Sequence, residues 1–262
     1  MNLTKRNLLK ASGASLASLS IASISSSNAL AASTKDNSPA SAGSLNNITT
    51  SSQAITAQER LSRISKAQAL MQRQNMAAII IEPGAAMDYF SGVQWWRSER
   101  LSALIIPREG PVAFVCPFFE EPSIRETLMV GDDVRVWQEH ESPFEKIKQI
   151  LNDRKITSGL IGFEESVRYF ALKGVMNILP AMQHASAEPI TRACRMIKSH
   201  HELRLMHKAN EVTLRAYAHV FSLLEVGMSS ADVNALMASA QANLGGEEAW
   251  NMVLINEASA FP

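Results

Sequence analysis

From residue 56 to residue 180, short apolar runs alternate with amphipathic helical patterns, and this alternation constrains the fold more than any other feature. Residues 77–81 form a run rich in β-branched side chains that ends at Glu82-Pro83-Gly84, which is typical of a buried strand closing in a turn. The residues before it, 57–73, carry apolar side chains at helical spacing. Alternating elements of both kinds predict a mixed sheet flanked by helices, an α/β fold.

The remaining elements of this first domain follow from the same patterns. Strands are expected over residues 101–106, 112–116, 134–137 and 159–163, and helices over 118–130, 143–152 and 167–178. The turn sequence Pro107-Arg108-Glu109-Gly110 predicts that the first two of these strands form an antiparallel hairpin. Thr56 and Glu59 make the Thr-x-x-Glu pattern of a capping box, so we expect the domain to cover residues 56–190.

A second region is expected over residues 195–262. Ser199 and Glu202 make another capping box, ahead of a long helix whose apolar stripe runs from Leu203 to Leu224. A shorter helix and a strand follow, over residues 229–244 and 250–255.

The first residues are predicted to be an export signal. Residues 1–31 contain early basic residues, then a stretch rich in Ser, Ala and Leu, then small residues at Ala29 and Ala31 where a signal peptidase would cut. The many serines make the stretch too weakly apolar to favour a permanent membrane span. We therefore expect a mature protein that begins at Ala32 and is exported to the bacterial periplasm or secreted.

The basic residues carry a more specific signal. The segment Thr4-Lys5-Arg6-Asn7-Leu8-Leu9-Lys10 resembles the twin-arginine export motif, with Lys5 in place of the first arginine. That export machinery carries folded proteins, and because of Lys5 the general secretory route remains an alternative. Residues 32–55 are mostly Ser, Asn, Thr, Ala and Gly, a composition that predicts a flexible linker.

Composition sets aside several functions. The chain has 25 basic and 25 acidic residues and no run of Lys and Arg, so nothing supports nucleic-acid binding. Cys116 and Cys194 are too few for a disulfide framework and lack the spacing of a zinc site. We expect buried thiols, with a single bridge between them as the alternative for an exported protein.

No pattern in the chain forms a catalytic or metal site by itself. His201 and His207 lie about 240° apart around a helix, so they cannot hold one ion together with His200. We expect all three to be exposed on the first two turns of their helix. Gly245-Gly246 follows no strand and precedes no phosphate-loop lysine, so it is a helix stop rather than a nucleotide loop.

The aromatic and charged segment 89–100 contains the candidate contact site. Trp95 and Trp96 are adjacent, and successive side chains of an extended segment point to opposite sides, so at least one indole is expected at the surface. Trp and Arg are favoured at interfaces, which makes Trp95, Trp96 and Arg97 candidates for a substrate or subunit contact. One packed indole beside a solvated cluster of charged residues is the alternative.

Several motifs resemble one known family. Residues 195–209 resemble, at every specified position, the junction pattern Arg-x-Ile-Lys-Ser-x-x-Glu-Leu-x-x-Met-x-x-Ala of the M24 metallopeptidase family, the group of Xaa-Pro aminopeptidase, prolidase and creatinase. Tyr89-Phe90-Ser91-Gly92 matches its Tyr-Leu-x-Gly turn. Residues 227–232 and 256–262 are similar to a helix start and a strand end of the family, each with one departure.

The resemblance implies a creatinase-like amino-terminal domain, followed by the first helices and strand of an α+β "pita-bread" catalytic domain. In that family two divalent metal ions, often manganese, are held by two Asp, one His and two Glu, and activate a water that attacks the peptide bond before proline. All these positions lie beyond the match to Pro262. We therefore expect no catalytic residue and no metal ligand in this chain, which by itself would be inactive.

The resemblance also implies partners. Proline-containing peptides would be the substrates, the full-length protein would be a homodimer or higher homo-oligomer, and the loop with Trp95, Trp96 and Arg97 would approach the active site of a partner subunit. Three functions remain alternatives: the amino-terminal portion of an exported Xaa-Pro peptidase-like metallohydrolase, a creatinase-like or lyase member of the same fold, and a non-catalytic binding or dimerisation module.

Overall fold

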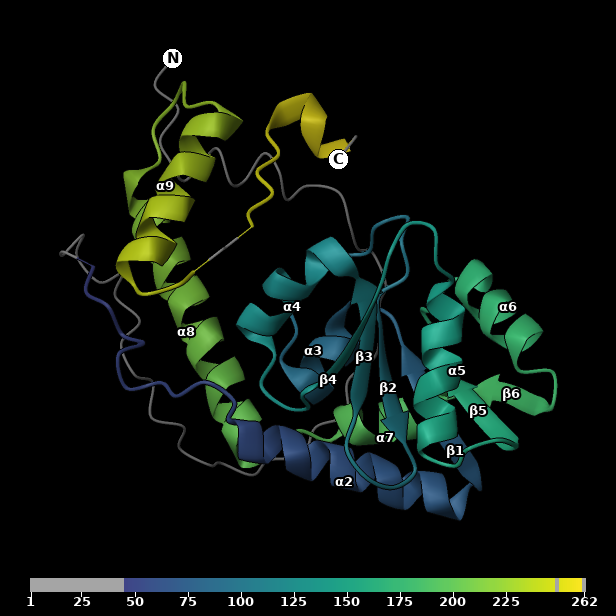
Figure 1. Cartoon of the computed structure of the whole chain (residues 1–262). Helices are drawn as coiled ribbons and strands as arrows, with labels where there is room; N and C mark the ends of the chain where they lie inside the picture. The colour runs from purple at the N-terminus through teal and green to yellow at the C-terminus, as the bar shows by residue number, and fades with distance from the viewer. Residues whose placement is uncertain (1–44, 248–249, 261–262) are drawn as a thin grey trace, which may run out of the picture. The chain divides into compact units, whose positions relative to one another are not determined.

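The structure is a computed structural model that describes residues 45–247 and 250–260 (Figure 1). The predicted signal peptide with its cleavage site, and residues 32–44 of the predicted linker, lie outside the described residues. The chain divides into two compact units, and the first, Ala54–Glu202, is called the α/β unit below. In the described part of the chain, no helix has the length and apolar character that crossing a bilayer requires.

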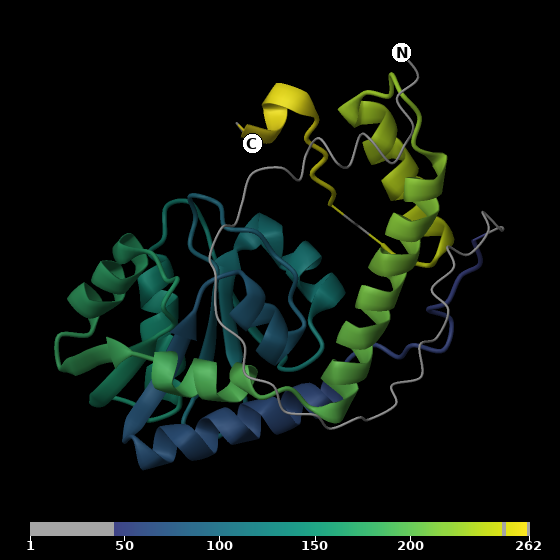
Figure 2. The same cartoon turned by 180° about the vertical axis from the view of Figure 1, so that it is seen from behind.

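The α/β unit is built on a six-stranded mixed sheet, as predicted (Figures 1 and 2). The strand order is β4-β3-β2-β1-β5-β6, and β2 runs antiparallel to the other five strands of the sheet. The strands are β1 (Met76–Ile81), β2 (Ala103–Pro107), β3 (Ala113–Pro117), β4 (Asp133–Trp137), β5 (Gly159–Phe163) and β6 (Met182–Ser186). The predicted hairpin is confirmed, since β2 and β3 pair with Leu104 opposite Phe114.

Helices cover both faces of the sheet. They are α2 (Ala57–Arg73), α3 (Ala85–Ser91), α4 (Glu121–Thr127) after the short 3₁₀ turn Phe118–Glu120, α5 (Pro143–Asp153), α6 (Tyr169–Ile178) and α7 (Glu188–Met196). α2, α3, α4 and α7 pack on one face, where alternate strand residues such as Ile79, Ile81 and Phe114 are buried. α5 and α6 pack on the other face against the intervening residues, such as Ile80 and Ile105. Successive side chains of a strand point to opposite faces of the sheet, so each strand contributes residues to the cores on both faces.

α2 begins at the predicted capping box. Thr56 Oγ1 accepts a hydrogen bond from the N–H of Glu59 at 3.2 Å, and Glu59 Oε2 accepts one from the N–H of Thr56 at 2.8 Å. The predicted apolar stripe differs at its start, because Leu61 is exposed and Arg60 is buried in its place. Arg60 donates to the backbone carbonyl and the carboxylate of Asp88 on α3, which compensates its burial.

Gly92 explains the turn motif that follows α3. It has a φ of 89°, in the left-handed region, and a Cβ there would lie 2.7 Å from Met129 Cγ. A side chain at this position would therefore be excluded both by backbone strain and by contact.

β6 and α7 are not anticipated by the sequence patterns. β6 is an edge strand whose side chains are mostly exposed, so it lacks the apolar run of a buried strand. α7 buries Ile190, Thr191 and Cys194 beside the sheet. The domain end predicted at residue 190 therefore falls inside a helix that contributes to the core.

The second unit comprises the chain up to Gln53 and from Leu203 onward. It contains most of α8 (His200–Leu223) and all of α9 (Ser230–Asn243), which share an apolar cluster that includes Val212, Ala216, Val220 and Met237. Ser229 caps α9 through a reciprocal pair of hydrogen bonds with Asp232, at the start of the helix predicted over residues 229–244. Residues 250–255, predicted as a strand, pair with no strand in the described ranges, and a 3₁₀ turn follows at Asn256–Ala260.

The end of the predicted linker is ordered, which corrects the expectation for residues 45–52. Leu45 and Ile48 pack against the α8–α9 cluster, and the N–H of Ile48 donates to the carbonyl of Leu244 at 3.0 Å. Two apolar side chains and one backbone hydrogen bond are enough to hold this segment in place, although its average composition suggests a flexible linker.

Both cysteines are buried free thiols, which confirms the simpler of the two expectations. Burial raises the pKa of the Cys116 thiol to about 12, and burial also raises the pKa of Cys194. Neither group is a thiolate at neutral pH, so neither is a reactive nucleophile.

Candidate functional site

The candidate contact loop, residues 94–102, lies at one end of the sheet. It leads into β2, whose start is at the edge where the parallel strands β1, β3 and β5 end. The turns after β1, β3 and β5 therefore surround it. In α/β sheets this carboxyl edge is where ligands commonly bind.

Trp95 is held inside the loop. Its ring packs against the core on the α2 side of the sheet, and Nε1 donates to Glu120 Oε2 at 3.0 Å. Glu120 is buried, and the same oxygen accepts a hydrogen bond from Ser102 Oγ at 3.0 Å. The buried carboxylate thus joins both ends of the loop.

Trp96 points the other way, as the alternation argument predicts. Its side chain is 90% exposed, although large apolar groups are usually buried at least in part. Arg97, which follows it, donates from Nε to the carbonyl of Pro83 at 2.9 Å and from Nη2 to Ser166 Oγ. The guanidinium of Arg97 therefore ties the loop to the turns after β1 and β5.

A buried ion pair supports the far side of the same loop. Glu82 has no exposed side-chain surface, and it accepts three bonds from Arg168: from Nη2 at 2.6 Å, Nε at 3.1 Å and the backbone N–H at 2.7 Å. Arg168 also donates to the carbonyls of Ser98 and Arg100. Because two buried carboxylates fix this loop, Trp96 is exposed on a rigid support rather than on a free segment.

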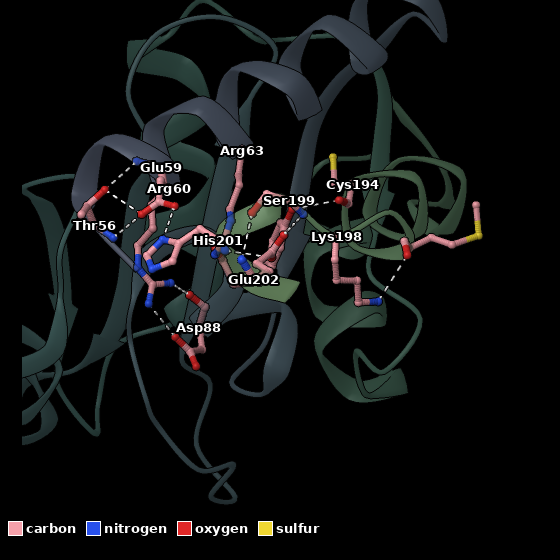
Figure 3. Close-up of polar contacts among 12 residues, drawn as sticks. Thr56, Glu59, Arg60, Arg63, Asp88, Cys194, Lys198, Ser199, His201 and Glu202 are labelled. Atoms are coloured by element: carbon pink, nitrogen blue, oxygen red, sulfur yellow. Dashed lines mark hydrogen bonds and ion pairs between the residues drawn. The ribbon is translucent and has the colours of Figure 1, made fainter. Parts of the chain in front are cut away.

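A second cluster joins α2 to the first turn of α8, inside the α/β unit (Figure 3). Glu202 Oε2 accepts from the N–H of Ser199 at 2.6 Å, so the predicted capping box forms, and its Oε1 accepts from Arg63 Nη2 at 2.9 Å. Glu59 is arranged in the same way, with Oε2 on its own helix and Oε1 at 2.7 Å from His201 Nδ1. Each capping-box glutamate therefore also binds a side chain of the opposite helix.

The histidine prediction needs one correction. His200 and His207 are exposed, as expected, but His201 is half-buried because of its contact with Glu59. In residues 45–247 and 250–260 there is no group of three or more His, Cys, Asp and Glu side chains that could hold a metal ion.

The structure thus defines an α/β domain with a hydrogen-bonded aromatic loop at the carboxyl edge of its sheet. Residues 63–197 match the family described as Creatinase/Prolidase N-terminal domain, and the chain belongs to this family. The family resemblance inferred from the sequence motifs is therefore confirmed.

Relatives and solved structures agree with this assignment. The probable dipeptidase PepE of Mycobacterium tuberculosis is 26% identical over 180 residues, which cover 68% of this chain and 47% of that protein. The putative dipeptidase YkvY of Bacillus subtilis is 25% identical over 205 residues, covering 77% and 56%. This chain therefore spans about half the length of the curated relatives it matches.

The crystal structure of dipeptidase PepE from Mycobacterium ulcerans has a TM-score of 0.61 and 25% identity, covering 72% of this chain and 51% of that one. A prolidase from Thermococcus sibiricus has a TM-score of 0.63 at 19% identity, covering 75% and 52%, and shares the fold. Over the matched part, the chain shares its fold with about half of each of these two proteins.

Three residues that organise the loop escaped the sequence analysis. Glu82 stands directly after a buried strand, and a charge in that position is a signal that could have drawn attention to it. Glu120 and Arg168 carry no such signal, because their roles depend on loops that meet only in the folded sheet.

Proposed function

We propose that this chain is the amino-terminal portion of an exported Xaa-Pro peptidase-like metallohydrolase, which cleaves the peptide bond before proline. The observation that carries the proposal is the family match over residues 63–197, together with relatives named as dipeptidases. In this proposal the α/β unit shapes the substrate opening and takes part in assembly of a homodimer or higher homo-oligomer.

Trp96 and Arg97 are proposed to make the substrate or subunit contact, and Trp95 to hold them in place. The exposed indole of Trp96 supports this role, because a rigid aromatic side chain gives a large contact area and loses little conformational freedom on binding. The hydrogen bonds of Arg97 to Pro83 and Ser166 keep the neighbouring backbone fixed.

The described residues do not fit a two-metal centre, since they contain no suitable group of ligands. No catalytic step is therefore assigned to them. The two divalent ions of the proposed enzyme, manganese by resemblance, would be held by residues that follow the position of Pro262. Bound there, they would activate the attacking water.

The experiment that tests the function uses the longer protein. The coding sequence downstream of Pro262 is read first: a histidine at the next position and five later metal ligands are expected. The protein is then purified, dialysed against a chelator, and assayed for proline release from an Xaa-Pro dipeptide with and without added manganese.

The outcomes separate the three alternatives. Manganese-dependent proline release supports the proposal. Intact metal ligands without peptide cleavage would instead favour creatinase-like or lyase chemistry, and replacement of the ligands would favour a binding or dimerisation module. The 262-residue chain assayed beside it is expected to release no proline.

A further inference from the structure

Residues 45–52, called the strap below, pack against α8 and α9 within the second unit (Figures 1 and 2). Leu45 and Ile48 are half-buried against the apolar cluster of these helices, whereas Asn46 and Thr50 are exposed. Among the described residues that cluster has six buried side chains, so two further apolar contacts are a large addition to its packing.

Hydrogen bonds hold the strap at the carboxyl end of α9. The N–H of Ile48 donates to the carbonyl of Leu244 at 3.0 Å. Thr49 Oγ1 lies 3.1 Å from the carbonyl oxygen of Gly245, which is 196 residues away in the sequence. The last carbonyl groups of a helix have no partner within the helix, so they need donors from elsewhere. The strap supplies such donors at this helix end.

Short-range bonds give the strap a defined shape. Asn47 Oδ1 accepts a hydrogen bond from the N–H of Thr49 at 2.8 Å, which is the bond of an Asx turn. The N–H of Ser52 donates to the carbonyl of Thr49 at 2.8 Å and closes the turn that follows. A segment that is ordered by its own bonds loses less conformational freedom when it binds, which favours docking.

Gly245 has no room for a side chain because of the strap. Its φ is 89°, and a Cβ at this position would collide with Asn47 Oδ1 and Thr49 Oγ1. Gly227, which follows α8, has a similar φ of 100°, but a Cβ there would meet no atom of the described residues within 4 Å. The left-handed backbone favours glycine at both positions. Of the two, Gly245 is also required by the close approach of the strap.

The strap bridges a groove rather than lying on a flat surface. A cavity of about 310 Å³ remains beside it, and Thr49 and Ser52 of the strap are among its lining residues. α8 contributes Leu205, Ala209 and Val212 to the same lining. The strap and the helix therefore enclose this space together, and removal of the strap would open it to solvent.

We propose that the strap is an intramolecular ligand of the α8–α9 hairpin, which holds the two helices in their native packing. Leu45 and Ile48 provide the apolar contacts, the Ile48 N–H and the Thr49 hydroxyl provide the polar ones, and Gly245 gives them access. The match to the Creatinase/Prolidase N-terminal domain begins at residue 63, so the strap lies outside the matched residues. The inference uses the second unit alone and does not rest on the proposed peptidase function.

Amide hydrogen exchange of the 262-residue chain tests the strap directly. In the wild type the Ile48 amide should exchange at least about tenfold more slowly than in an unstructured peptide, because it donates to Leu244. Leu45→Asp combined with Ile48→Asp should abolish this protection. It should also speed exchange in α8 and α9 about tenfold, since unpaired charges are excluded from an apolar cluster. Exchange in the α/β unit should stay unchanged, because that unit has its own cores.

Asn46→Asp combined with Thr50→Asp is the matched control. It adds the same charge to the strap at two exposed positions, and it should exchange like the wild type.

The two glycines provide an independent test. Gly245→Ala should release the strap and abolish the protection of the Ile48 amide. Gly227→Ala should keep that protection, although both variants carry similar backbone strain. When each is added to Leu45→Asp with Ile48→Asp, Gly245→Ala should affect α8 and α9 no more than Gly227→Ala does, because the strap is already released.

The proposal is overturned if the Ile48 amide of the wild type is unprotected, or if the aspartates at 45 and 48 change exchange in α8 and α9 no more than the control pair does. Protection of Ile48 that falls on about tenfold dilution would also overturn it, because the groove would then hold the strap of a second copy. If the aspartates at 45 and 48 unfold the α/β unit as well, the glycine variants decide. Equal protection of Ile48 in Gly245→Ala and Gly227→Ala would then overturn the proposal.

Discussion

Trp95 Nε1 lies 3.0 Å from Glu120 Oε2, a buried carboxylate, whereas the next side chain, Trp96, is 90% exposed. The two adjacent indoles therefore have different environments on one rigid loop. Trp95 contributes to the fold, and Trp96 is available for contact. This separation makes it feasible to change the proposed contact without changing the stability of the domain.

We expect Trp95→Ala to lower the free energy of unfolding by about 2–3 kcal/mol, because it removes core packing and one bond to a buried carboxylate. Trp96→Ala should change it by less than about 0.5 kcal/mol, since the side chain is nearly free in solvent. Urea unfolding of each variant measures both values. The sequence alone made both tryptophans candidates for the contact, and the packing of Trp95 leads us to expect that role for Trp96.

In the proposed full-length enzyme, Trp96→Ala should reduce turnover of an Xaa-Pro dipeptide while the protein stays folded. Tyr169→Ala is the matched control, because Tyr169 on α6 is also an exposed aromatic residue of the α/β unit but lies outside the loop. Equal activity of the Trp96 variant, the Tyr169 variant and the wild type would contradict the proposed contact.

The buried pair of Glu82 and Arg168 gives a second prediction. Arg168→Met should destabilise the protein by about 3–5 kcal/mol, because it leaves the fully buried Glu82 carboxylate unpaired. The double variant Arg168→Met with Glu82→Gln should regain part of the lost stability, because its buried side chain at position 82 carries no charge. Thermal and urea unfolding of the single and double variants measure this coupling.

Arg192→Met provides the comparison for that experiment. Arg192 pairs with Glu188 on the exposed surface of α7, and such pairs contribute at most about 1 kcal/mol. If Arg192→Met destabilises the protein as much as Arg168→Met does, burial is not the reason for the effect.

Much of the α/β unit was predictable because its strands are short apolar runs and its helix starts are capped by side chains close in sequence. Thr56 with Glu59, and Ser199 with Glu202, form the bonds that their spacing indicates. Such local interactions depend on a few neighbouring residues, so sequence patterns represent them well.

The interactions that define the loop and the cluster between α2 and the first turn of α8 were not predictable in this way. Arg168 lies 86 residues from Glu82 in the sequence, and Glu202 lies 139 residues from Arg63. Their pairing requires the sheet order and the position of α7. The opposite case also occurs. Ser142 stands before Pro143 and three residues before Glu145, a pattern that indicates a side-chain cap, yet Ser142 makes no such hydrogen bond at the start of α5.

Glu59 predicts a pH dependence of stability. Hydrogen bonding by the N–H of Thr56, and then by His201, lowers the pKa of Glu59 from 4.5 to about 2. A carboxylate with a lowered pKa stabilises the folded state above its unfolded pKa, and this contribution is lost as pH falls from about 4.5 toward 2. Glu59→Gln should therefore lower the free energy of unfolding by about 1 kcal/mol at pH 7. The difference between the variant and the wild type should disappear as the pH falls through that acidic range.

Urea unfolding at a series of pH values measures this difference. Glu126→Gln on α4 is the control, because Glu126 is exposed and its side chain makes no hydrogen bond or ion pair with the described residues. If Glu59→Gln destabilises the protein equally at neutral and at strongly acidic pH, the charge of Glu59 is not the source of the effect.

Export gives a prediction that rests on the sequence. We expect mass spectrometry of the exported protein to find Ala32 as its first residue. Lys5→Gln combined with Arg6→Gln should block export if the twin-arginine route carries it. An intact Met1 in the periplasmic or secreted fraction would contradict the cleavage, and export unaffected by the double substitution would contradict the twin-arginine route.

The last prediction concerns the end of the α/β unit. A fragment of residues 54–202 contains both cores of the sheet, together with the bonds that join α2 to the first turn of α8. We expect it to be soluble and to unfold in one cooperative transition. A fragment that ends at residue 190, where the sequence patterns place the boundary, lacks most of α7.

The shorter fragment loses the buried Cys194 side chain and the hydrogen bond from the Tyr89 hydroxyl to the Cys194 carbonyl at 2.8 Å. It also exposes apolar surface of α2 and the sheet. We expect a loss of at least about 3 kcal/mol, with binding of a hydrophobic dye and aggregation on size-exclusion chromatography. Equal urea midpoints for the two fragments would instead show that α7 is dispensable and that residue 190 is an adequate domain end.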